Sequence, residues 1–372
     1  MKLEITRKDF LKSWSLAERF TDINKNILLI ADNETLQLKA TDLKTSVLCK
    51  SDGVNVIEDG VAVVPASILG SMIRKSASDD LVLDINSERG FCKAGRSKMR
   101  FPVVSANQFP QIADSSSAET ICEIDSDTLS TLILEGSSAA GKPADFPKYH
   151  GTSLFRTQSG KIKVVSTDGK RLAFSERPCE KISKDTDLLL PAPAFRELAK
   201  TLQKDKIVTI SADAAFVFFV LDGIEFSIRL IDAVFPQYER ILNDIVETSL
   251  KVRNEDLISA LERIDIIAST TPHHGMAMNL NTNGELRIAA RSPERGTASE
   301  SFYADIDGKY LEIGFNVGYF LDGLKILGNG EISIEFSGSE SQARMKRVGS
   351  DDFLYMLMPA RLSEQDRVSD DF

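Results

Sequence analysis

Histidine, cysteine and long apolar stretches are scarce in this sequence. Only three histidines and four cysteines occur among 372 residues, and the cysteines are widely spaced, at Cys49, Cys92, Cys122 and Cys179. A chain of this length does not need disulfides, and no C-x-x-C pair is present, so we expect reduced, buried thiols in a cytosolic protein. No stretch approaches the roughly 20 apolar residues that span a bilayer. The opening MKLEITRKDFLKSW lacks the apolar core of a signal peptide, which predicts a soluble, cytoplasmic protein.

Sequence motifs for catalysis and nucleotide binding are missing as well. There is no G-x-S-x-G, no H-E-x-x-H and no G-x-G-x-x-G after an expected strand. The segment Gly136–Pro143 has the spacing of a phosphate-binding loop up to its last position. There Pro143 replaces the Ser or Thr whose hydroxyl would bind magnesium, and the segment follows an expected helix. We therefore interpret it as a Gly- and Ser-rich loop with one exposed lysine, Lys142.

The remaining candidates for a metal or acid–base site have simpler interpretations. His273 and His274 are adjacent, so their side chains point in different directions, and a turn is the better interpretation. Asp125 and Asp127 are in the position of polar residues that precede a helix. The sequence thus predicts no catalytic residue, no metal site and no cofactor, and we do not expect an enzyme.

The charge balance limits the kinds of partner. Lys and Arg total 45 against 55 Asp and Glu, which gives a formal net charge of −10 and an isoelectric point near 5.1. This excludes a uniformly basic surface but allows a basic strip on one face. With 42% hydrophobic and 27% charged residues the composition is that of a globular protein, and the length predicts two or three domains.

Three segments share one pattern of a short strand, a polar turn and the start of an apolar helix. They are KLEITRKDFLKSW from Lys2, CEIDSDTLSTLI from Cys122 and LKVRNEDLISAL from Leu250. After each come a polar turn with an alternating strand, a strand that leads into a second helix, and a closing pair of strands. Four corresponding elements in the same order make a chance resemblance improbable. We predict an α+β fold of three repeated domains, each with antiparallel strands and two helices, at residues 1–117, 118–246 and 247–372.

The first expected helix carries basic side chains opposite its apolar stripe. Phe10 and Trp14 have the spacing of a buried stripe, whereas Lys8, Lys12 and Arg19 lie on the opposite face. Basic faces that recur on equivalent helices suit contact with phosphate backbones without sequence readout. The alternative is that these residues only maintain solubility.

A second basic face is expected in the helix that follows Pro193. Its apolar stripe, which extends to Leu202, should face inward and leave Arg196, Lys200 and Lys204 exposed. Taken over all repeats, the candidate DNA-facing residues are Lys8, Lys12, Arg19, Arg74, Lys142, Arg196, Lys200 and Lys204.

Four further segments carry a specific resemblance to a known family. They are Thr167–Leu172, Phe235–Leu242, Glu312–Val317 and Met358–Leu362. Together they resemble the signature segments of the bacterial sliding clamp, the beta subunit of DNA polymerase III, and the resemblance covers essentially the whole chain to Leu362. It implies the DNA clamp fold, in which a head-to-tail homodimer forms a six-domain ring whose twelve helices line a central hole.

The resemblance also implies a function. A clamp loader opens such a ring around double-stranded DNA, without sequence preference. The ring then serves as a processivity factor in the cytoplasm, where it tethers the replicative DNA polymerase alpha subunit and other proteins with a clamp-binding motif. The alternative from another class is a ring- or arc-shaped interaction scaffold with no role on DNA.

A partner-peptide pocket between the second and third domains is implied too. Its mixture of apolar walls and a few cations suits an extended peptide with one or two polar anchors. By position, the pocket consists of Thr167, Gly169, Lys170, Arg171, Leu172, Pro236, Arg240, Ile241, Met356, Leu357, Met358, Pro359, Ala360, Arg361 and Leu362. Exposed strand edges of the terminal domains are expected to pair in the dimer, with Met99 and Ile267 as candidate contacts.

Three features depart from the family's pattern. The loop Phe20–Asn26 is shorter than usual and lacks the usual Arg and Pro, so the resemblance does not carry a DNA contact to it. His150 stands at a pocket-edge position that is usually apolar. The segment Ser363–Phe372 extends past the usual end, and its glutamine and apolar residues are suited to imitate a partner peptide. The alternative for this segment is a disordered acidic extension.

Overall fold

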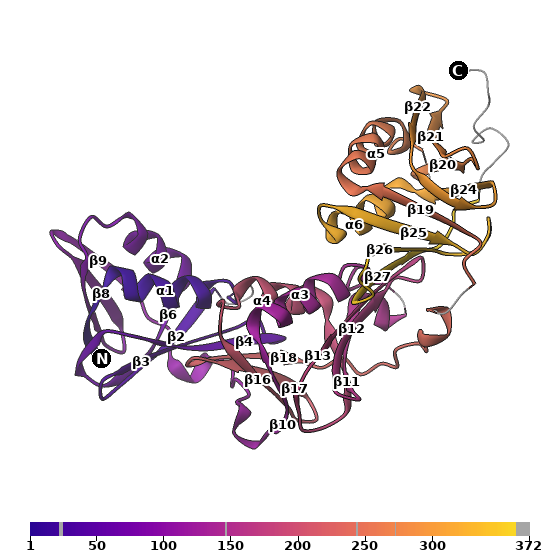
Figure 1. Ribbon diagram of the computed structural model, residues 1–372. Coiled ribbons are helices and arrows are strands. Elements are labelled where there is room, and N and C mark those ends of the chain that lie inside the picture. The colour runs from indigo at the N-terminus through magenta and orange to yellow at the C-terminus, as the bar shows by residue number, and fades with distance from the viewer. Residues whose placement is uncertain (22–24, 146, 243–244, 272, 362–372) are drawn as a thin grey trace. The chain divides into compact units, whose positions relative to one another are not determined.

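A computed structural model describes residues 1–21, 25–145, 147–242, 245–271 and 273–361 (Figure 1). The chain folds into two compact units. Unit 1 consists of Met1–Thr128, Lys181–Thr186 and Lys200–Leu230, and unit 2 of Leu129–Glu180, Asp187–Ala199 and the described residues from Ile231 onward. No described helix is long and apolar enough to cross a membrane.

Unit 1 contains two antiparallel sheets and the helices α1 and α2, which lie side by side (Figure 1). The strand order is β5-β1-β7-β8-β9 in one sheet and β14-β10-β16-β17-β18-β4-β3-β2-β6 in the other. The elements are β1 (Lys2–Thr6), α1 (Arg7–Glu18), β2 (Asn26–Asp32), β3 (Thr35–Thr41), β4 (Thr45–Ser51), β5 (Val54–Glu58), β6 (Gly60–Pro65), α2 (Ala66–Lys75), β7 (Asp80–Ile85), β8 (Arg89–Ala94), β9 (Ser97–Pro102), β10 (Glu119–Asp125), β14 (Lys181–Ile182), β16 (Ile207–Ala212), β17 (Phe216–Leu221) and β18 (Ile224–Arg229), with the short helices η1 (Ala106–Gln108) and η2 (Ser115–Ser117).

Unit 2 also contains two antiparallel sheets, and its helices α5 and α6 pack against each other (Figure 1). The strand order is β15-β11-β12-β13-β27-β26-β25-β19-β23 in the larger sheet and β22-β21-β20-β24 in the smaller one. The elements, which include the two helices that lie mostly in this unit, are α3 (Ser126–Gly136), η3 (Lys148–Gly151), β11 (Thr152–Gln158), β12 (Lys161–Thr167), β13 (Arg171–Pro178), β15 (Thr186–Pro191), α4 (Ala192–Thr201), η4 (Glu239–Ile241), β19 (Thr248–Arg253), α5 (Asn254–Ala268), β20 (Gly275–Leu280), β21 (Glu285–Ser292), β22 (Gly296–Tyr303), β23 (Asp305–Gly308), β24 (Leu311–Asn316), α6 (Val317–Leu327), β25 (Glu331–Phe336), β26 (Ala343–Arg347) and β27 (Phe353–Leu357).

The three repeats share their sheets. The middle repeat contributes β10, β14, β16, β17 and β18 to the large sheet of unit 1, where Ile224 of β18 lies opposite Cys49 of β4. It also contributes β11, β12, β13 and β15 to the large sheet of unit 2, where Leu172 of β13 lies opposite Met356 of β27. Each repeat has two α-helices and antiparallel strands, so the predicted α+β fold of three repeated domains is confirmed.

One helix in each repeat begins at a polar cap. In the first two repeats it is the helix of the repeated strand–turn–helix segment, whereas in the third it is the second helix, α6, because α5 has no side-chain cap. The side chains of Thr6, Asp125 and Asn316 each accept a hydrogen bond from the amide three residues later, at 3.1, 2.8 and 2.9 Å. These bonds satisfy amides that have no partner within the first helical turn. Asp125 and Asp127 therefore mark the start of α3, as predicted.

Helix α4 differs from the prediction at both ends. It begins at Ala192, so Pro193 lies in the first turn, where a missing N–H costs nothing. It ends at Thr201, and Asp205 has a φ of 56° in the turn that follows. Leu202 and Lys204 thus lie beyond the helix, and the prediction of a helical stripe that reaches them was wrong. The buried Leu198 is among the last apolar residues of that stripe.

Large aromatic and aliphatic side chains fill the core of each unit. In unit 1, Phe10 and Trp14 of α1 are fully buried, and their stacked rings are 5.0 Å apart. In unit 2, α5 and α6 pack their apolar faces against strands of both sheets, with Phe315 and Phe320 among the buried residues. All four cysteines are free and buried, as predicted.

Candidate functional site

A groove on unit 2 is formed where β13 and β27 pair. In this pairing Arg171 lies opposite Leu357 and Leu172 opposite Met356. The segment around η4 and the residue that precedes β26 complete the walls. The lining residues are Thr167, Gly169, Lys170, Arg171, Leu172, Ile241, Gln342, Met356, Leu357 and Met358.

The turn before β13 has a fixed shape. The Thr167 hydroxyl donates to the Arg171 carbonyl at 2.6 Å, and Asp168 accepts from the amides of Lys170 and Arg171 at 3.0 and 3.1 Å. Gly169 has a φ of 82°, a backbone conformation that favours glycine. This turn presents Lys170 to solvent at the rim of the groove and leaves the side chain of Leu172 inside.

The groove is apolar at its floor and at its mouth. Leu172 and Met356 are 4% and 2% exposed and belong to a small core with Tyr238. Ile241 and Met358, in contrast, are 40% and 48% exposed. Exposed apolar side chains beside a buried apolar floor suit the docking of an apolar segment.

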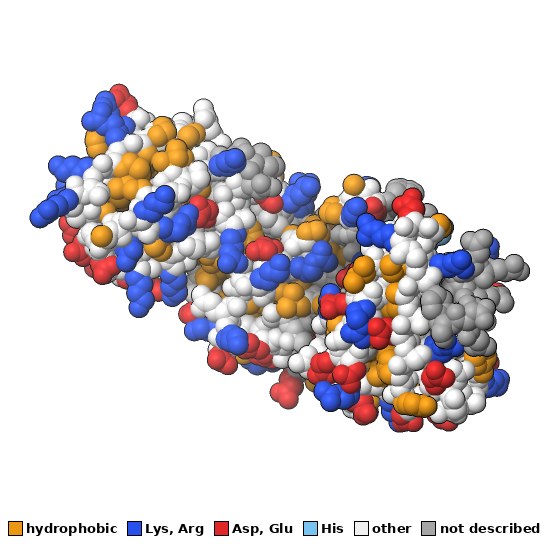
Figure 2. All heavy atoms as spheres, turned by 90° about the horizontal axis from the view of Figure 1, so that it is seen from above, with side chains coloured by type: hydrophobic (Ala, Val, Ile, Leu, Met, Phe, Trp, Pro, Cys, Tyr) orange, Lys and Arg blue, Asp and Glu red, His pale blue; other side chains and the backbone are white. Residues whose placement is uncertain are grey.

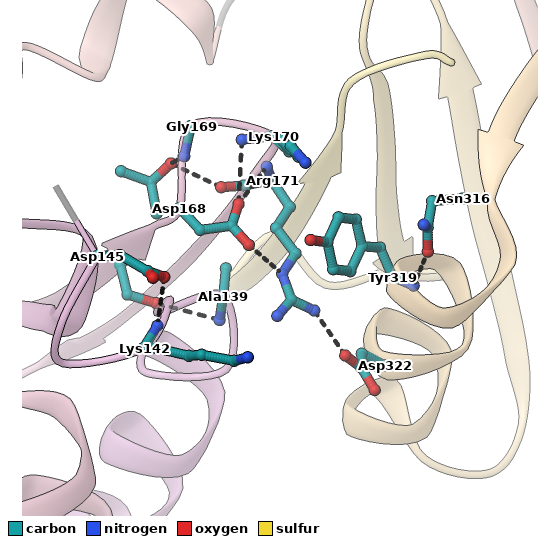
Figure 3. Close-up of polar contacts among 12 residues, drawn as sticks. Ala139, Lys142, Asp145, Asp168, Gly169, Lys170, Arg171, Asn316, Tyr319 and Asp322 are labelled. Atoms are coloured by element: carbon teal, nitrogen blue, oxygen red, sulfur yellow. Dashed lines mark hydrogen bonds and ion pairs between the residues drawn. The ribbon is translucent and has the colours of Figure 1, made fainter. Parts of the chain in front are cut away.

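Arg171 lines the groove, but its charge is neutralised within the protein. Nε donates to Asp168 at 3.0 Å, and Nη1 donates to Asp322 at 2.6 Å (Figure 3). Nη1 also donates to the Tyr355 hydroxyl at 3.1 Å. The guanidinium carbon lies 4.3 Å from the centre of the Tyr319 ring. Burial opposes the charge, but Tyr355, Asp322 and Asp168 stabilise it, so the pKa of Arg171 is raised. Arg171 therefore joins β13 to α6 and is not available as an anchor for a ligand.

The predicted pocket residues fall into four groups in the structure. Thr167, Gly169, Lys170, Arg171, Leu172, Ile241, Met356, Leu357 and Met358 line the groove. Pro359, Ala360 and Arg361 line a neighbouring hollow, with Met358 shared between the two. Pro236 and Arg240 are exposed and line neither of them, and Leu362 lies outside the described residues.

Gln342 lines the groove but was missed from the sequence. Its amide donates to the Ile241 carbonyl at 3.3 Å. It precedes β26, which pairs with β27 and thereby comes next to the groove. Only the strand pairing indicates its position, because Gln342 belongs to no repeated or resembling segment.

The basic face predicted for α1 is exposed. Lys8, Lys12 and Arg19 are all solvent-exposed, and Lys12 lies 3.6 Å from Asp52. Arg74 of α2 is exposed too, and it makes a two-pronged ion pair with Glu18 at 2.8 and 3.0 Å. Figure 2 shows Asp and Glu side chains among the Lys and Arg side chains on the surface of each unit.

The prediction that Arg196 lies on an exposed face was wrong. It is half-buried, and its Nη1 donates to the Ser137 carbonyl at 2.7 Å. Burial, with a smaller contribution from Arg171, lowers the pKa of Arg196. Lys200 is exposed on α4, and Lys204 is exposed beyond its end. Lys142 is exposed in the loop after α3, where its amide donates to Asp145 at 2.7 Å.

The two candidate dimer contacts lie on the terminal repeats. Met99 is half-buried in β9, the edge strand of its sheet. Ile267 of α5 is half-buried against the core of unit 2, whereas its neighbour Ile266 is 62% exposed. Strand β22 is an edge strand of the smaller sheet of unit 2.

The features that depart from the family's pattern are only partly described. His150 lies in η3 next to the groove turn, since a Cβ placed on Gly169 would be 3.3 Å from its Nε2. The loop Phe20–Asn26 is described only at its ends, and Ser363–Phe372 lies outside the described residues. His274 contacts Asp265 and has a φ of 51° in the turn before β20. Among the described residues no group of three His, Cys, Asp or Glu is placed to hold a metal.

Family models for the DNA polymerase III beta subunit match the chain in order. The N-terminal domain matches residues 1–113, the central domain 123–237 and the C-terminal domain 239–361. The beta sliding clamps of Pseudomonas aeruginosa and Escherichia coli are 30% and 28% identical to the chain, and each match covers 97% of this chain and all of the relative.

Solved structures of the same kind resemble the fold. The crystal structure of the DNA polymerase III subunit beta from Pseudomonas aeruginosa has a TM-score of 0.91 at 27% identity, over 97% of this chain and all of that one. The beta chain from Streptococcus pneumoniae, at 22% identity, has a TM-score of 0.92 with the same coverage, which shows the common fold.

Proposed function

The chain belongs to the DNA polymerase III beta subunit family, and on this premise we propose that it is a sliding clamp, a processivity factor that encircles duplex DNA and tethers the replicative polymerase. The observation that carries the proposal is the match of all three domain models in order along one chain. It favours the clamp over a scaffold with no role on DNA. In this role the chain is a non-catalytic accessory subunit.

The proposed ring is a head-to-tail homodimer of about 82 kDa, twice the 41.0 kDa of one chain. An edge strand of the first repeat, β9, would pair with one of the third repeat, β22, near Met99 and Ile267. The unpaired edges of both strands support this arrangement, because a long exposed edge favours pairing.

The proposed DNA contacts are electrostatic and independent of sequence. Lys8 and Lys12 of α1 and Arg19, which follows its last residue, are the strongest candidates, since all three are exposed. Lys142, Lys200 and Lys204 are exposed too. Arg74 is exposed and makes a two-pronged ion pair with Glu18, and Arg196 is half-buried and donates to a backbone carbonyl. We expect the three cations at α1 and the three further lysines to contact phosphates. Arg74 and Arg196 should mainly stabilise the fold through their contacts within the protein.

The groove on unit 2 is the proposed site for partner peptides. Its apolar floor and mouth suit the apolar end of an extended peptide, and Thr167, Lys170 and Gln342 provide polar groups at its walls. Clamp loader and polymerase alpha subunit would then compete for one groove on each chain.

Primer extension tests the processivity role. A replicative polymerase and its clamp loader would copy a singly primed circular single strand with and without this chain, under conditions of a single binding event. We expect products of several thousand nucleotides only when the chain is present. Products of the same short length in both reactions would contradict the proposal.

A further inference from the structure

A strap of chain, Ile231–Leu242, crosses one face of the larger sheet in unit 2. At its start, the Ile231 amide donates to the Leu189 carbonyl of β15 at 2.9 Å. Further along, Tyr238 is 2% exposed and packs on side chains of β11, β12, β13 and β27. The strap ends at η4, where Ile241 forms one wall of the groove.

An arginine from the middle repeat holds the strap on one side. Arg156 of β11 makes a two-pronged ion pair with Asp187 at 2.6 and 2.7 Å, and its Nη1 lies 2.5 Å from Glu239 of η4. Its guanidinium carbon lies 5.6 Å from the centre of the Tyr238 ring. The bond to Asp187 outweighs the effect of burial, so the pKa of Arg156 is raised and its charge persists.

An arginine from the third repeat holds the last residue of the strap. Arg344 of β26 donates from Nη1 to the Leu242 carbonyl at 2.7 Å, and its Nη2 pairs with Glu335 at 3.0 Å. The side chains of Arg344 and Glu335 are only 13% and 17% exposed. A charge-assisted bond in such a position is stronger than one at the open surface. Beside it, Gln342 donates to the Ile241 carbonyl.

We infer that Arg156 and Arg344 are positioning residues that hold the Ile241 wall and so set the width of the groove. The two strands that carry them, β11 and β26, are separated in the sheet by β12, β13 and β27, and the groove lies over the last two of these. Because Arg156 comes from the middle repeat and Arg344 from the third, the strap joins these two repeats at the groove. The inference rests on the proposed function only where it concerns the peptide.

The position of the wall is measured directly on the full-length chain, without a ligand. The methyl NMR signal of Ile241 would be compared in wild type, Arg344→Ala and Lys346→Ala. Lys346 is a matched control, since it lies on the same strand and also pairs with Glu335, at 3.1 Å, but no described contact joins it to the strap. We expect the Ile241 signal to shift or broaden in Arg344→Ala alone. An unchanged signal in Arg344→Ala would overturn the inference, whatever the chain binds.

The consequence for binding is measured with two fluorescent five-residue peptides that begin with glutamine. One ends in leucine and phenylalanine, the other in two valines. We expect Arg344→Ala to bind the first peptide about tenfold more weakly, because the displaced Ile241 wall loses part of its apolar contact with the peptide, and to lose part of its preference over the second. Arg344→Lys should recover part of both, because an ammonium group still reaches one carbonyl.

These outcomes separate the inference from the proposed function. Wild type that binds neither peptide, together with a shifted Ile241 signal in Arg344→Ala, would count against the peptide groove and leave the positioning role supported. Equal affinity and preference in wild type, Arg344→Ala and Lys346→Ala would overturn the positioning role. If Arg344→Ala does not fold, Gln342→Ala removes the neighbouring bond to the Ile241 carbonyl and serves in the NMR measurement, which needs no peptide.

Discussion

Two neighbouring residues that line the groove, Arg171 and Leu172, have different roles. The guanidinium of Arg171 is taken up by Asp168, Asp322 and Tyr355, whereas the side chain of Leu172 forms the apolar floor. Lys170, which precedes them, is exposed at the rim. At the scale of single residues, affinity for a peptide should therefore come from apolar contacts more than from the cations.

Met358→Asp tests this distribution of binding energy. Met358 is 48% exposed, so aspartate at this position leaves the core intact but places a carboxylate against the apolar end of the peptide. We expect an affinity loss of about 30-fold, which corresponds to about 2 kcal/mol. Lys170→Ala, the control at the rim, should cost about threefold or less. Fluorescence titration that finds equal losses of affinity in the two variants would contradict the assignment of most of the binding energy to the apolar floor and mouth of the groove.

The buried cysteines predict how stability depends on pH. Burial raises the pKa of the Cys49 thiol from 9.0 to about 12 and that of Cys92 to about 11. The unfolded chain releases these protons near pH 9, whereas the folded chain retains them. The contribution of these two thiols to the free energy of unfolding should thus be constant below pH 9 and fall as pH rises from there toward 11–12, by about 1.4 kcal/mol per pH unit for each thiol. Urea unfolding of wild type and of a Cys49→Ala/Cys92→Ala variant checks this, and parallel pH profiles would contradict it.

At the scale of elements, α5 and α6 are joined by a side chain at the start of one and the end of the other. Asn254, the first residue of α5, is fully buried, and its amide donates to the carbonyls of Leu324 and Gly328 at 2.8 and 2.5 Å. Carbonyls in the last turn of a helix have no partner within it. One asparagine thus satisfies two acceptors at the end of α6 and fixes the contact between the two helices.

Asn254→Ala should lower the free energy of unfolding by about 1–2 kcal/mol, because the half-buried Gly328 carbonyl loses its donor and the Leu324 carbonyl keeps only the Gly328 amide. Asn55→Ala is a suitable control, since Asn55 is exposed in β5 and a substitution there should change stability by about 0.5 kcal/mol or less. Urea unfolding followed by circular dichroism measures both. A loss below about 1 kcal/mol for Asn254→Ala would show that this contact does not hold the helices together.

Local elements were predictable from the sequence, whereas pairings over long distances were not. The caps Thr6, Asp125 and Asn316 carry local signals, because their partners lie three residues away. The pairing of β18 with β4, and of β13 with β27, joins different repeats, and alternation within a strand does not encode its neighbour. Gln342 was missed for this reason. The groove turn at Thr167 was found through the family resemblance.

The same limit explains why the exposure of Arg196 was misjudged. Helical spacing indicates which side chains share a face, but not whether another element covers that face. Arg196 has the spacing of an exposed residue and yet donates to the Ser137 carbonyl, from a segment about 60 positions earlier. Arg74 has its carboxylate partner on α1, at Glu18. Ion pairs between distant segments are decided by tertiary packing.

At the scale of the whole molecule, β9 of the first repeat and β22 of the third are each the edge strand of a described sheet. The chain as a whole has a net charge of −10, and the exposed cations of α1 are a local basic feature within it. An acidic protein of this kind should bind free DNA weakly and remain on it through topology, because a closed ring needs no strong contact to stay in place.

Retention on circular DNA tests this central claim most directly. The labelled chain would be loaded onto a nicked plasmid by a clamp loader with ATP, separated from free protein by gel filtration at moderate salt, and then treated with an enzyme that cuts the plasmid once. We expect the chain to co-elute with the nicked circle and to be lost once the circle is linear, while a mock-treated circle retains it. Equal retention on circular and linear DNA, or none on the circle, would contradict the account.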